Sequence, residues 1–263
     1  MLRRFVPDYD SRKAALRALG GGWSGETVTD STDTSLGLCL RWTQRSLAVA
    51  RRLNAGECDA SYLEACLLVS GLASGLAALA WPGTGRDKAR FAEAWVRLAD
   101  PQLGTQRISL PALKRTLLAD GNHADGQAII GLRPQVLRQH SCRVLTGQDV
   151  DADEAEVVTA CPSMAVTTIR QHSYSALFYT HVRSAVVHEY AVGDHAETRA
   201  TTQRDVMGVS YSNCLTESGA VLRRIFFHFE WLAAVVSNVA ASLDSAGDSF
   251  ERAEPTRWWL HGG

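Results

Sequence analysis

Lysine is scarce in this chain: Lys13, Lys88 and Lys114 are the only ones among 263 residues, so almost every basic side chain is an arginine. Neither sign of charge dominates, since 27 Lys and Arg residues oppose 28 Asp and Glu residues for a net charge of −1. That balance argues against recognition of nucleic acid through a broad basic surface. Nucleic acid would have to be held locally, for which arginine is suited because its planar guanidinium makes two parallel hydrogen bonds to a phosphate.

Short cysteine pairs are also missing, because the six cysteines include no C-x-x-C spacing. Zinc sites usually need that spacing to hold two ligands together, so we expect no metal and no other cofactor. Hydrophobic residues make up 46% of the chain and charged residues 21%, which excludes a disordered protein or a small disulfide framework. No apolar run follows the basic start of the chain, so a secretory signal is not indicated and we expect a cytoplasmic protein.

Long uncharged runs are limited to one segment, residues 65–85. Pro82 and Gly83 must end a helix there, which leaves about 17 residues, the short limit for a membrane span. No basic cluster flanks the segment. We therefore expect a buried core helix, in which Gly71 and Gly75 allow close helix–helix approach, and no membrane association.

Apolar residues recur at helical spacing through most of the chain, whereas strand-like patterns are few. One short piece, residues 206–211, has a β-like pattern. We therefore predict an all-α protein, an antiparallel helical bundle with a short β-like excursion at this piece. The expected long helices cover residues 36–54, 60–81, 87–100, 166–190 and 220–244.

Composition also divides the chain. Residues 1–35 are rich in Ser, Thr, Asp and Gly and are expected to form a flexible or irregular N-terminal arm. Residues 36–250 hold the predicted helices and form one domain, in which the stretch at about 101–163 is mixed in character. Residues 251–263 have no clear pattern and are assigned to a C-terminal tail.

An acidic stretch near the middle of the chain superficially resembles a calcium-binding loop. Its acidic residues are Asp149, Asp151, Asp153, Glu154 and Glu156. Glu154 stands where such a loop needs a glycine, so the chain could not make the required sharp turn. The acidic start of a helix, favoured by the helix dipole, is the better interpretation.

The strongest candidate site lies in the fourth predicted helix, where Arg183-Ser-Ala-Val-Val-His188 places an arginine five residues before a histidine. Cleavage of RNA without a metal needs a proton acceptor for the 2′-hydroxyl, a proton donor for the leaving oxygen and positive charge at the phosphate. Histidine can take or give a proton near neutral pH, and arginine is a permanent cation. One such pair is too small for a full acid–base cycle, but a symmetric dimer would place two pairs in one cleft.

This motif resembles the R-x(4–6)-H motif of the HEPN superfamily, helical-bundle domains many of which are metal-independent ribonucleases. Ser184 is the polar residue that commonly follows the arginine, and Tyr190 gives the R-x(4)-H-x-Y form of HEPN toxins that are paired with a minimal nucleotidyltransferase antitoxin. The order of elements is also similar, because the family's motif helix is followed by a polar loop and a further long helix. The resemblance covers roughly residues 36–100 and 165–245, which makes about 101–163 an insertion.

The resemblance implies a metal-independent endoribonuclease, a bacterial toxin or anti-phage effector, that cleaves RNA as a homodimer. Its partners would be the RNA substrate and an antitoxin or other regulatory protein. The catalytic residues would be Arg183 and His188. Supporting or RNA-binding roles are expected for Ser184, His181, Glu189 and Tyr190.

Two further pairs fit the R-x(4–6)-H motif: Arg133 with His140, with six residues between them, and Arg223 with His228, with four. The first spans Pro134, and the second lies among Phe226, Phe227 and Phe229, where His228 is expected to be a packed core histidine. Context therefore favours the pair at Arg183 and His188.

Helix geometry constrains this pair, because Arg183 and His188 lie about 140° apart around an ideal α-helix. They can converge only if the helix is distorted or the arginine reaches round it. His181, Ser184 and His188 would instead share one stripe, within about 60°. An alternative interpretation is that Arg183 pairs with Glu189 or another acid, in a non-catalytic HEPN-like module for dimerisation, nucleotide or RNA binding, or scaffolding.

Overall fold

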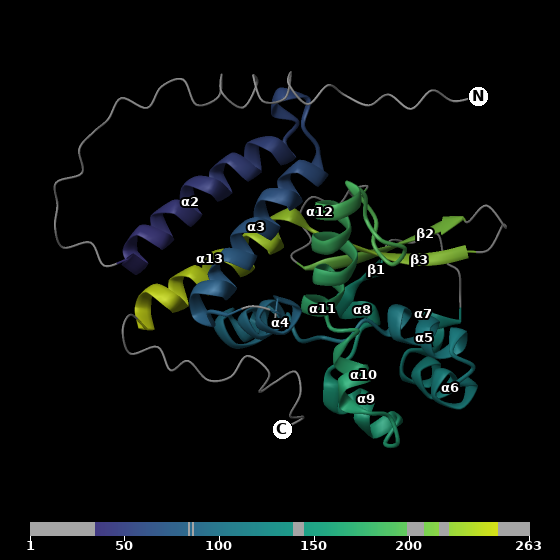
Figure 1. Ribbon diagram of the computed structural model, residues 1–263. Helices are drawn as coiled ribbons and strands as arrows, with labels where there is room; N and C mark the ends of the chain where they lie inside the picture. Colours follow the sequence, from purple (N-terminus) through teal and green to yellow (C-terminus); the bar gives the residue numbers. More distant parts are fainter. Residues whose placement is uncertain are drawn as a thin grey trace, which may run out of the picture. The chain divides into compact units, whose positions relative to one another are not determined.

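The computed structural model describes residues 35–83, 85, 87–138, 145–198, 208–215 and 221–246, all of which belong to the unit Thr34–Gly263 (Figure 1). The expected N-terminal arm lies outside these residues except for Ser35, which begins a helix. The expected C-terminal tail, residues 251–263, lies outside them as well.

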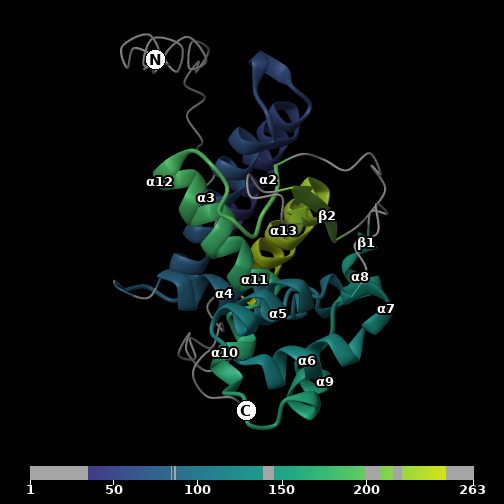
Figure 2. The same ribbon diagram turned by 90° about the vertical axis from the view of Figure 1, so that its right-hand side faces the viewer.

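Three of the predicted helices are confirmed: α2 (Ser35–Asn54), α3 (Tyr62–Ala80) and α4 (Asp87–Leu98). A short 3₁₀ turn, η1 (Glu57–Asp59), joins the first two. The Ser61 side chain caps α3, and the Glu64 carboxylate accepts a hydrogen bond from the Ser61 backbone N–H, a capping box that fixes where this helix begins. Both views show α2, α3 and the late helix α13 (Phe229–Ala246) packed side by side (Figure 1 and Figure 2).

Helix α3 is long and apolar enough to cross a membrane by length and composition, and no other helix in the described ranges is. Half of its most apolar stretch is buried inside the fold, with Cys66, Leu72 and Leu76 almost fully enclosed. The helix packs against α2, α4 and α13. These contacts fit the prediction of a core helix.

The prediction of an all-α protein is wrong in one region, because a small antiparallel sheet of order β1-β2-β3 is present. Its strands are β1 (Leu145–Thr146), β2 (Val209–Leu215) and β3 (Val221–Phe227). The expected helix at 220–244 therefore begins only at Phe229, and the β-like piece expected at 206–211 is part of a longer hairpin. β3 contains β-branched and aromatic residues, which favour a strand. Its pairing with β2, in which Ile225 lies opposite Tyr211, selects the strand over the predicted helix.

The helix predicted at 166–190 is a broken run. It consists of α10 (Val166–Arg170), α11 (Tyr174–Phe178), the π-helical turn η3 (Tyr179–Ser184) and α12 (Ala185–Glu189). The break arises because the backbone at Ser173 and Tyr174 pairs with an extended segment at Ile108 and Arg107. Ser173 then caps α11, its hydroxyl accepting a hydrogen bond from the Ala176 backbone.

The mixed stretch between α4 and α10 folds into short helices that share the core with the rest. They are η2 (Pro101–Leu103), α5 (Leu110–Ala119), α6 (His123–Leu132), α7 (Pro134–Leu137), α8 (Gly147–Val150) and α9 (Glu154–Ala160). Ile108, Leu110 and Leu113 in this stretch have no solvent exposure. The stretch is therefore part of the fold's interior.

A cluster of aromatic side chains joins α4, α11 and α13 at the centre of the core. The Trp95 ring lies 5.0 Å from Phe178 and 5.8 Å from Trp231, measured between ring centroids. Phe91 stacks on the same group, 4.9 Å from Trp95. Such contacts add to the large apolar area that these rings bury, so the cluster holds the three helices together.

We predict that Trp95→Ala lowers the free energy of unfolding by about 3–5 kcal/mol, because it leaves a cavity among the other rings. Chemical denaturation measures this change. Trp42→Ala is the control, since Trp42 is 52% exposed and its loss is expected to change stability by about 0.5 kcal/mol or less. Equal losses for the two variants would show that the cluster does not carry the core.

Candidate functional site

Arg183 lies in η3, a π-helical turn. Such turns have hydrogen bonds that span five residues, appear mostly as single turns within α-helices and are frequent at functional sites. The turn ends at Ser184, and Ala185–Glu189 is regular α-helix, so most of the segment from Arg183 to His188 keeps α-helical rotation. The distortion therefore lies at and before Arg183, not between Arg183 and His188.

The guanidinium of Arg183 is supported by uncharged groups. It lies over the Tyr179 ring, 5.0 Å from the centroid, and its Nε donates a weak hydrogen bond of 3.4 Å to Ser74 Oγ on α3. In the described part of the chain it forms no ion pair with a carboxylate, and Glu189 is exposed at the end of α12. The alternative in which Arg183 pairs with Glu189 is therefore not what the structure shows, and the positive charge of Arg183 is not neutralised by an acid.

His188 is exposed near the end of α12. No contact brings its imidazole to the Arg183 guanidinium within one copy of the described structure. Tyr190 ends the helix with a left-handed backbone, φ 53°, and its hydroxyl donates to the Glu64 carboxylate on α3. This bond ties the end of the motif helix to the capping box of α3.

His181 is turned toward a different part of the molecule. Its carbonyl accepts a 2.7 Å hydrogen bond from the Gly193 backbone, and its ring lies 4.6 Å from the His195 ring. Burial, followed by the positive charge of Arg115, lowers the pKa of His181 to about 4. His181 is therefore a neutral side chain at pH 7, and the structure does not bring it together with Arg183. Ser184 is half-buried on the same turn.

The other two arginine–histidine pairs are used by the fold or lie outside it. Arg133 pairs with Glu156 at 3.1 Å, and His140 lies outside the described residues. Arg223 donates a 2.8 Å hydrogen bond to the Val136 carbonyl. His228 is buried and bonds Ser210 Oγ at 2.9 Å, in agreement with the expected packed histidine.

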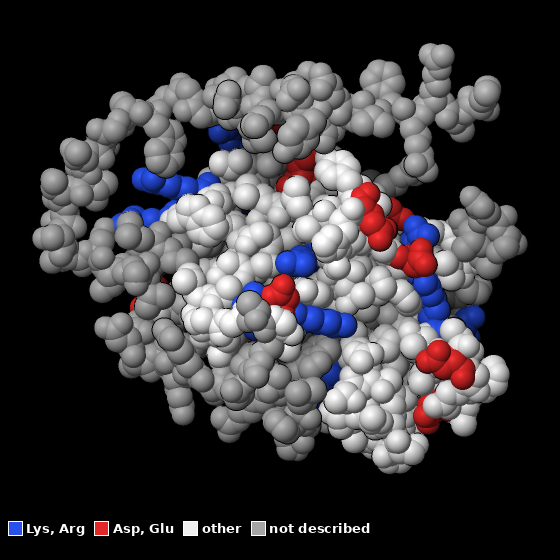
Figure 3. Space-filling model, in the orientation of Figure 1, with Lys and Arg blue, Asp and Glu red and all other residues white. Residues whose placement is uncertain are grey.

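The surface beside Arg183 and His188 is apolar. Leu67 on α3 is 39% exposed, and Val187 and Tyr190 at the end of α12 are 46% and 50% exposed. Figure 3 shows mostly uncharged side chains over the middle of this face, with acidic side chains at its upper end. We call Leu67, Val187 and Tyr190 the α3–α12 patch. They are on α3 and at the end of α12, two elements that pack against each other, and contiguous exposed apolar side chains mark interaction surfaces.

Comparison with known proteins gives no further guide. The chain matches no family model, and no curated protein or solved structure is significantly similar to it. Its chemistry must be argued from the side chains themselves.

A second polar centre was not predicted from the sequence. Asp151 has no solvent exposure, and its Oδ2 accepts hydrogen bonds from the hydroxyls of Tyr174 at 2.5 Å and Tyr211 at 2.6 Å. Its Oδ1 accepts from the Leu110 backbone at 3.1 Å. Burial raises the pKa of Asp151 to about 7, although the tyrosine hydrogen bonds act in the opposite direction. The expected acidic helix start is at Asp153, which caps α9.

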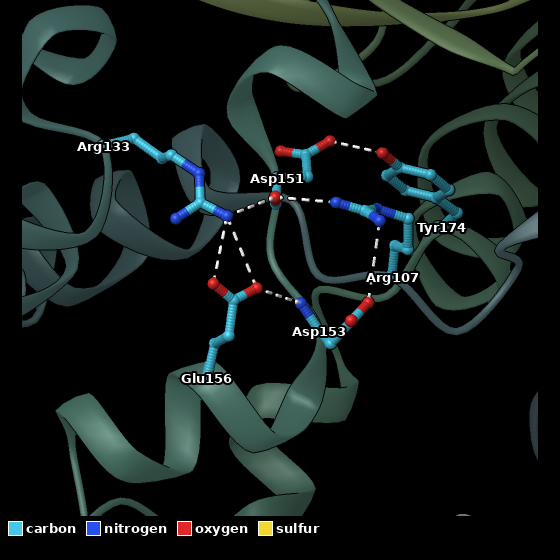
Figure 4. Close-up of polar contacts among 6 residues, drawn as sticks. All are labelled: Arg107, Arg133, Asp151, Asp153, Glu156 and Tyr174. Carbon is cyan, nitrogen blue, oxygen red and sulfur yellow. Dashed lines mark hydrogen bonds and ion pairs between the residues drawn. The ribbon is translucent and has the colours of Figure 1, made fainter.

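Charged groups surround the backbone of Asp151 rather than its carboxyl (Figure 4). Arg107 and Arg133 both donate to the Asp151 carbonyl oxygen, at 2.8 and 3.3 Å. Each arginine also meets an acid, Asp153 at 3.7 Å for Arg107 and Glu156 at 3.1 Å for Arg133. The positive charges are thus balanced locally, and the buried carboxyl has uncharged partners. No group of three or more metal-binding side chains is found in the described ranges.

We predict that Asp151 makes stability depend on pH. Its pKa in the folded state is raised above the unfolded value, so its contribution to stability is fully present below about pH 4 and is lost as the pH rises through about 7. Asp151→Asn cannot ionise, so this pH dependence of the free energy of unfolding should disappear in the variant. As the pH rises from about 4 to about 7, the free energy of unfolding of the variant should therefore increase relative to that of the wild type by up to about 4 kcal/mol. Denaturant unfolding across pH measures the difference.

Asp120→Asn is the matched control, because Asp120 is exposed and its substitution should leave the wild-type slope unchanged. A pH dependence that is identical in wild type and Asp151→Asn would contradict the prediction.

Proposed function

We propose that this protein is a metal-independent endoribonuclease of the HEPN type in which Arg183 and His188 act on the scissile phosphate. The observation that carries the proposal is the state of Arg183: a cation near the surface with an aromatic ring and a hydroxyl beside it and no carboxylate partner in the described structure. An arginine in that state can offer its planar guanidinium to a phosphate.

The reaction needs two histidines and an arginine, which two copies of the Arg183 and His188 pair would supply. The 2′-oxygen of the ribose attacks the adjacent phosphorus as its proton passes to one histidine, and the bond from phosphorus to the 5′-oxygen breaks as a second histidine gives that oxygen a proton. Arginine stabilises the charge that develops on the phosphate oxygens. The products are a 2′,3′-cyclic phosphate and a 5′-hydroxyl.

The second histidine would come from a second copy of the chain. The α3–α12 patch lies beside the motif, and a two-fold axis there would bring two copies of α12 face to face. Each copy would then contribute one Arg183 and one His188 to a shared cleft. This arrangement also accounts for the lack of contact between the two side chains within one copy.

The resemblance to HEPN toxins also suggests a cellular role for this activity. We propose a cytoplasmic toxin or anti-phage effector, whose activity is restrained by an antitoxin or another regulatory partner. Tyr190, exposed and two residues beyond His188, is the position through which such a partner could act on the site.

A second candidate function is a non-catalytic dimerisation or RNA-binding module. It is favoured by the exposure of His188, which no described side chain orients, and by a net charge of −1 that provides no general attraction for RNA. The two functions make different predictions for cleavage.

We predict that purified protein cleaves single-stranded RNA in EDTA and that His188→Ala lowers the rate by about 10²–10⁴-fold through loss of proton transfer. Arg183→Lys keeps the charge but loses the planar fork, and should also lose most of the activity. His123→Ala is the matched control, because His123 is exposed at the start of α6 and should have no role. Gel assays and mass spectrometry of the cyclic phosphate measure these outcomes.

Retained cleavage in well-folded His188→Ala would exclude the assigned catalytic role. If His228→Ala alone abolished activity without unfolding, the site would lie at Arg223 and His228 instead.

We predict a homodimer that Leu67→Asp and Val187→Asp convert to a monomer, because a buried carboxylate in an apolar interface is strongly unfavourable. Sedimentation velocity at micromolar concentration measures this. Val49→Asp is the control, since Val49 is 44% exposed on α2 and lies outside the α3–α12 patch. A wild-type monomer with full cleavage activity would contradict the shared cleft.

A further inference from the structure

A pocket of about 600 Å³ is lined in part by Tyr174, whose hydroxyl bonds the buried carboxyl of Asp151. Its walls come from η2 and the residues after it, from α8, from the first residues of β2 and from Tyr174 at the start of α11. This volume is in the range of sites that enclose small organic molecules. The lining includes none of Arg183, His188 or the α3–α12 patch, so the pocket is a separate feature.

The charges that line the pocket balance each other. Arg107 and Asp153 are 3.7 Å apart, and Arg107 is also fixed by its 2.8 Å hydrogen bond to the Asp151 carbonyl. An anion here would face Asp153, and a cation would face Arg107. The electrostatics therefore favour an uncharged ligand.

Three glutamine side chains, Gln102, Gln106 and Gln148, add amide groups to the polar lining. Gln102 and Gln148 are exposed at the pocket, and no hydrogen bond of either side-chain amide is found in the described residues. Gln106 Oε1 is a buried acceptor without a partner, and the adjacent Arg107 Nε is a buried donor without one. Leaving such groups unpaired is unfavourable. A ligand that both donates and accepts hydrogen bonds would therefore gain free energy by pairing with them.

The floor of the pocket is preorganised by the Asp151 network. The Tyr174 hydroxyl is held by Asp151, and a Cβ atom at Gly147 would lie only 2.1 Å from that hydroxyl oxygen. Only glycine fits at this position while the network is intact. Tyr174 is in turn packed edge-on against Trp231, with ring centroids 6.0 Å apart. A rigid floor of this kind lowers the entropic cost of binding.

We propose that this pocket is a binding site for a small uncharged ring compound that carries several O–H or N–H groups, the chemistry that nucleosides and monosaccharides share. The amides of Gln102 and Gln148 contact its polar edge, and the ion pair of Arg107 and Asp153 excludes charged analogues. The site is independent of RNA cleavage, so its test does not depend on that activity.

The test uses saturation-transfer NMR titrations of the full chain with four probes: adenosine, cytidine, glucose and N-acetylglucosamine. At least one class, nucleoside or sugar, should bind with a Kd of about 1 mM or tighter. Loss of two hydrogen bonds in Gln102→Ala/Gln148→Ala should weaken that binding about tenfold. The matched control Gln44→Ala/Gln127→Ala removes two exposed glutamines elsewhere and should change nothing.

A second measurement compares the binding of a neutral probe with that of its phosphorylated, anionic form. If adenosine binds, AMP should bind more weakly, and Asp153→Asn should reduce the difference. If sugars bind instead, glucose 6-phosphate takes the place of AMP. The proposal is overturned if none of the four probes binds at about 10 mM, if the pocket variant binds as well as the control, or if the phosphorylated probe binds as tightly as its neutral parent.

Discussion

The buried carboxyl of Asp151 joins three parts of the fold at one point. Asp151 accepts hydrogen bonds from Tyr174, Tyr211 and the Leu110 backbone, which belong to α11, β2 and α5. Tyr211 has one hydroxyl proton, so when it donates to Asp151 its oxygen is left to accept from Ser109, 2.8 Å away. Segments far apart in the sequence therefore meet at a single polar point inside an apolar core. Removing any partner would leave a buried polar group unpaired.

The same network fixes where the motif helix begins. Tyr174 is the first residue of α11, and its backbone nitrogen donates to the Arg107 carbonyl at 3.0 Å. From that point α11, η3 and α12 follow one another without interruption as far as Glu189. The pocket and the surface at Arg183 thus share no lining residue. They are connected by one helical run, which starts at Tyr174 in the pocket and ends beyond Arg183.

Local sequence signals predicted the early helices well and the later chain less well. Ser61 and Pro82 mark the ends of α3 within the chain itself, so no distant contact is needed to place it. Residues 221–227 fit a helical spacing and a strand equally, and only pairing of β3 with β2 selects the strand. Asp151 sits in an acidic run that resembles a helix start, and only its distant tyrosine partners distinguish it. The motif of Arg183 and His188 is local, so it can be recognised in the sequence. The π-helical turn that contains Arg183 depends on packing and cannot.

The two motif residues differ in what holds them. Arg183 lies over Tyr179, whose ring is 5.3 Å from Phe91 in the aromatic cluster, so the core determines where the guanidinium lies. Val186 is the last buried residue of α12, and His188 lies beyond it in solvent. One copy of the chain thus positions the cation and leaves the imidazole without a constraint. General acid–base catalysis requires the imidazole within hydrogen-bond reach of the proton it transfers. Under the proposed function that constraint comes from outside this copy, and a second copy docked on the α3–α12 patch would supply it.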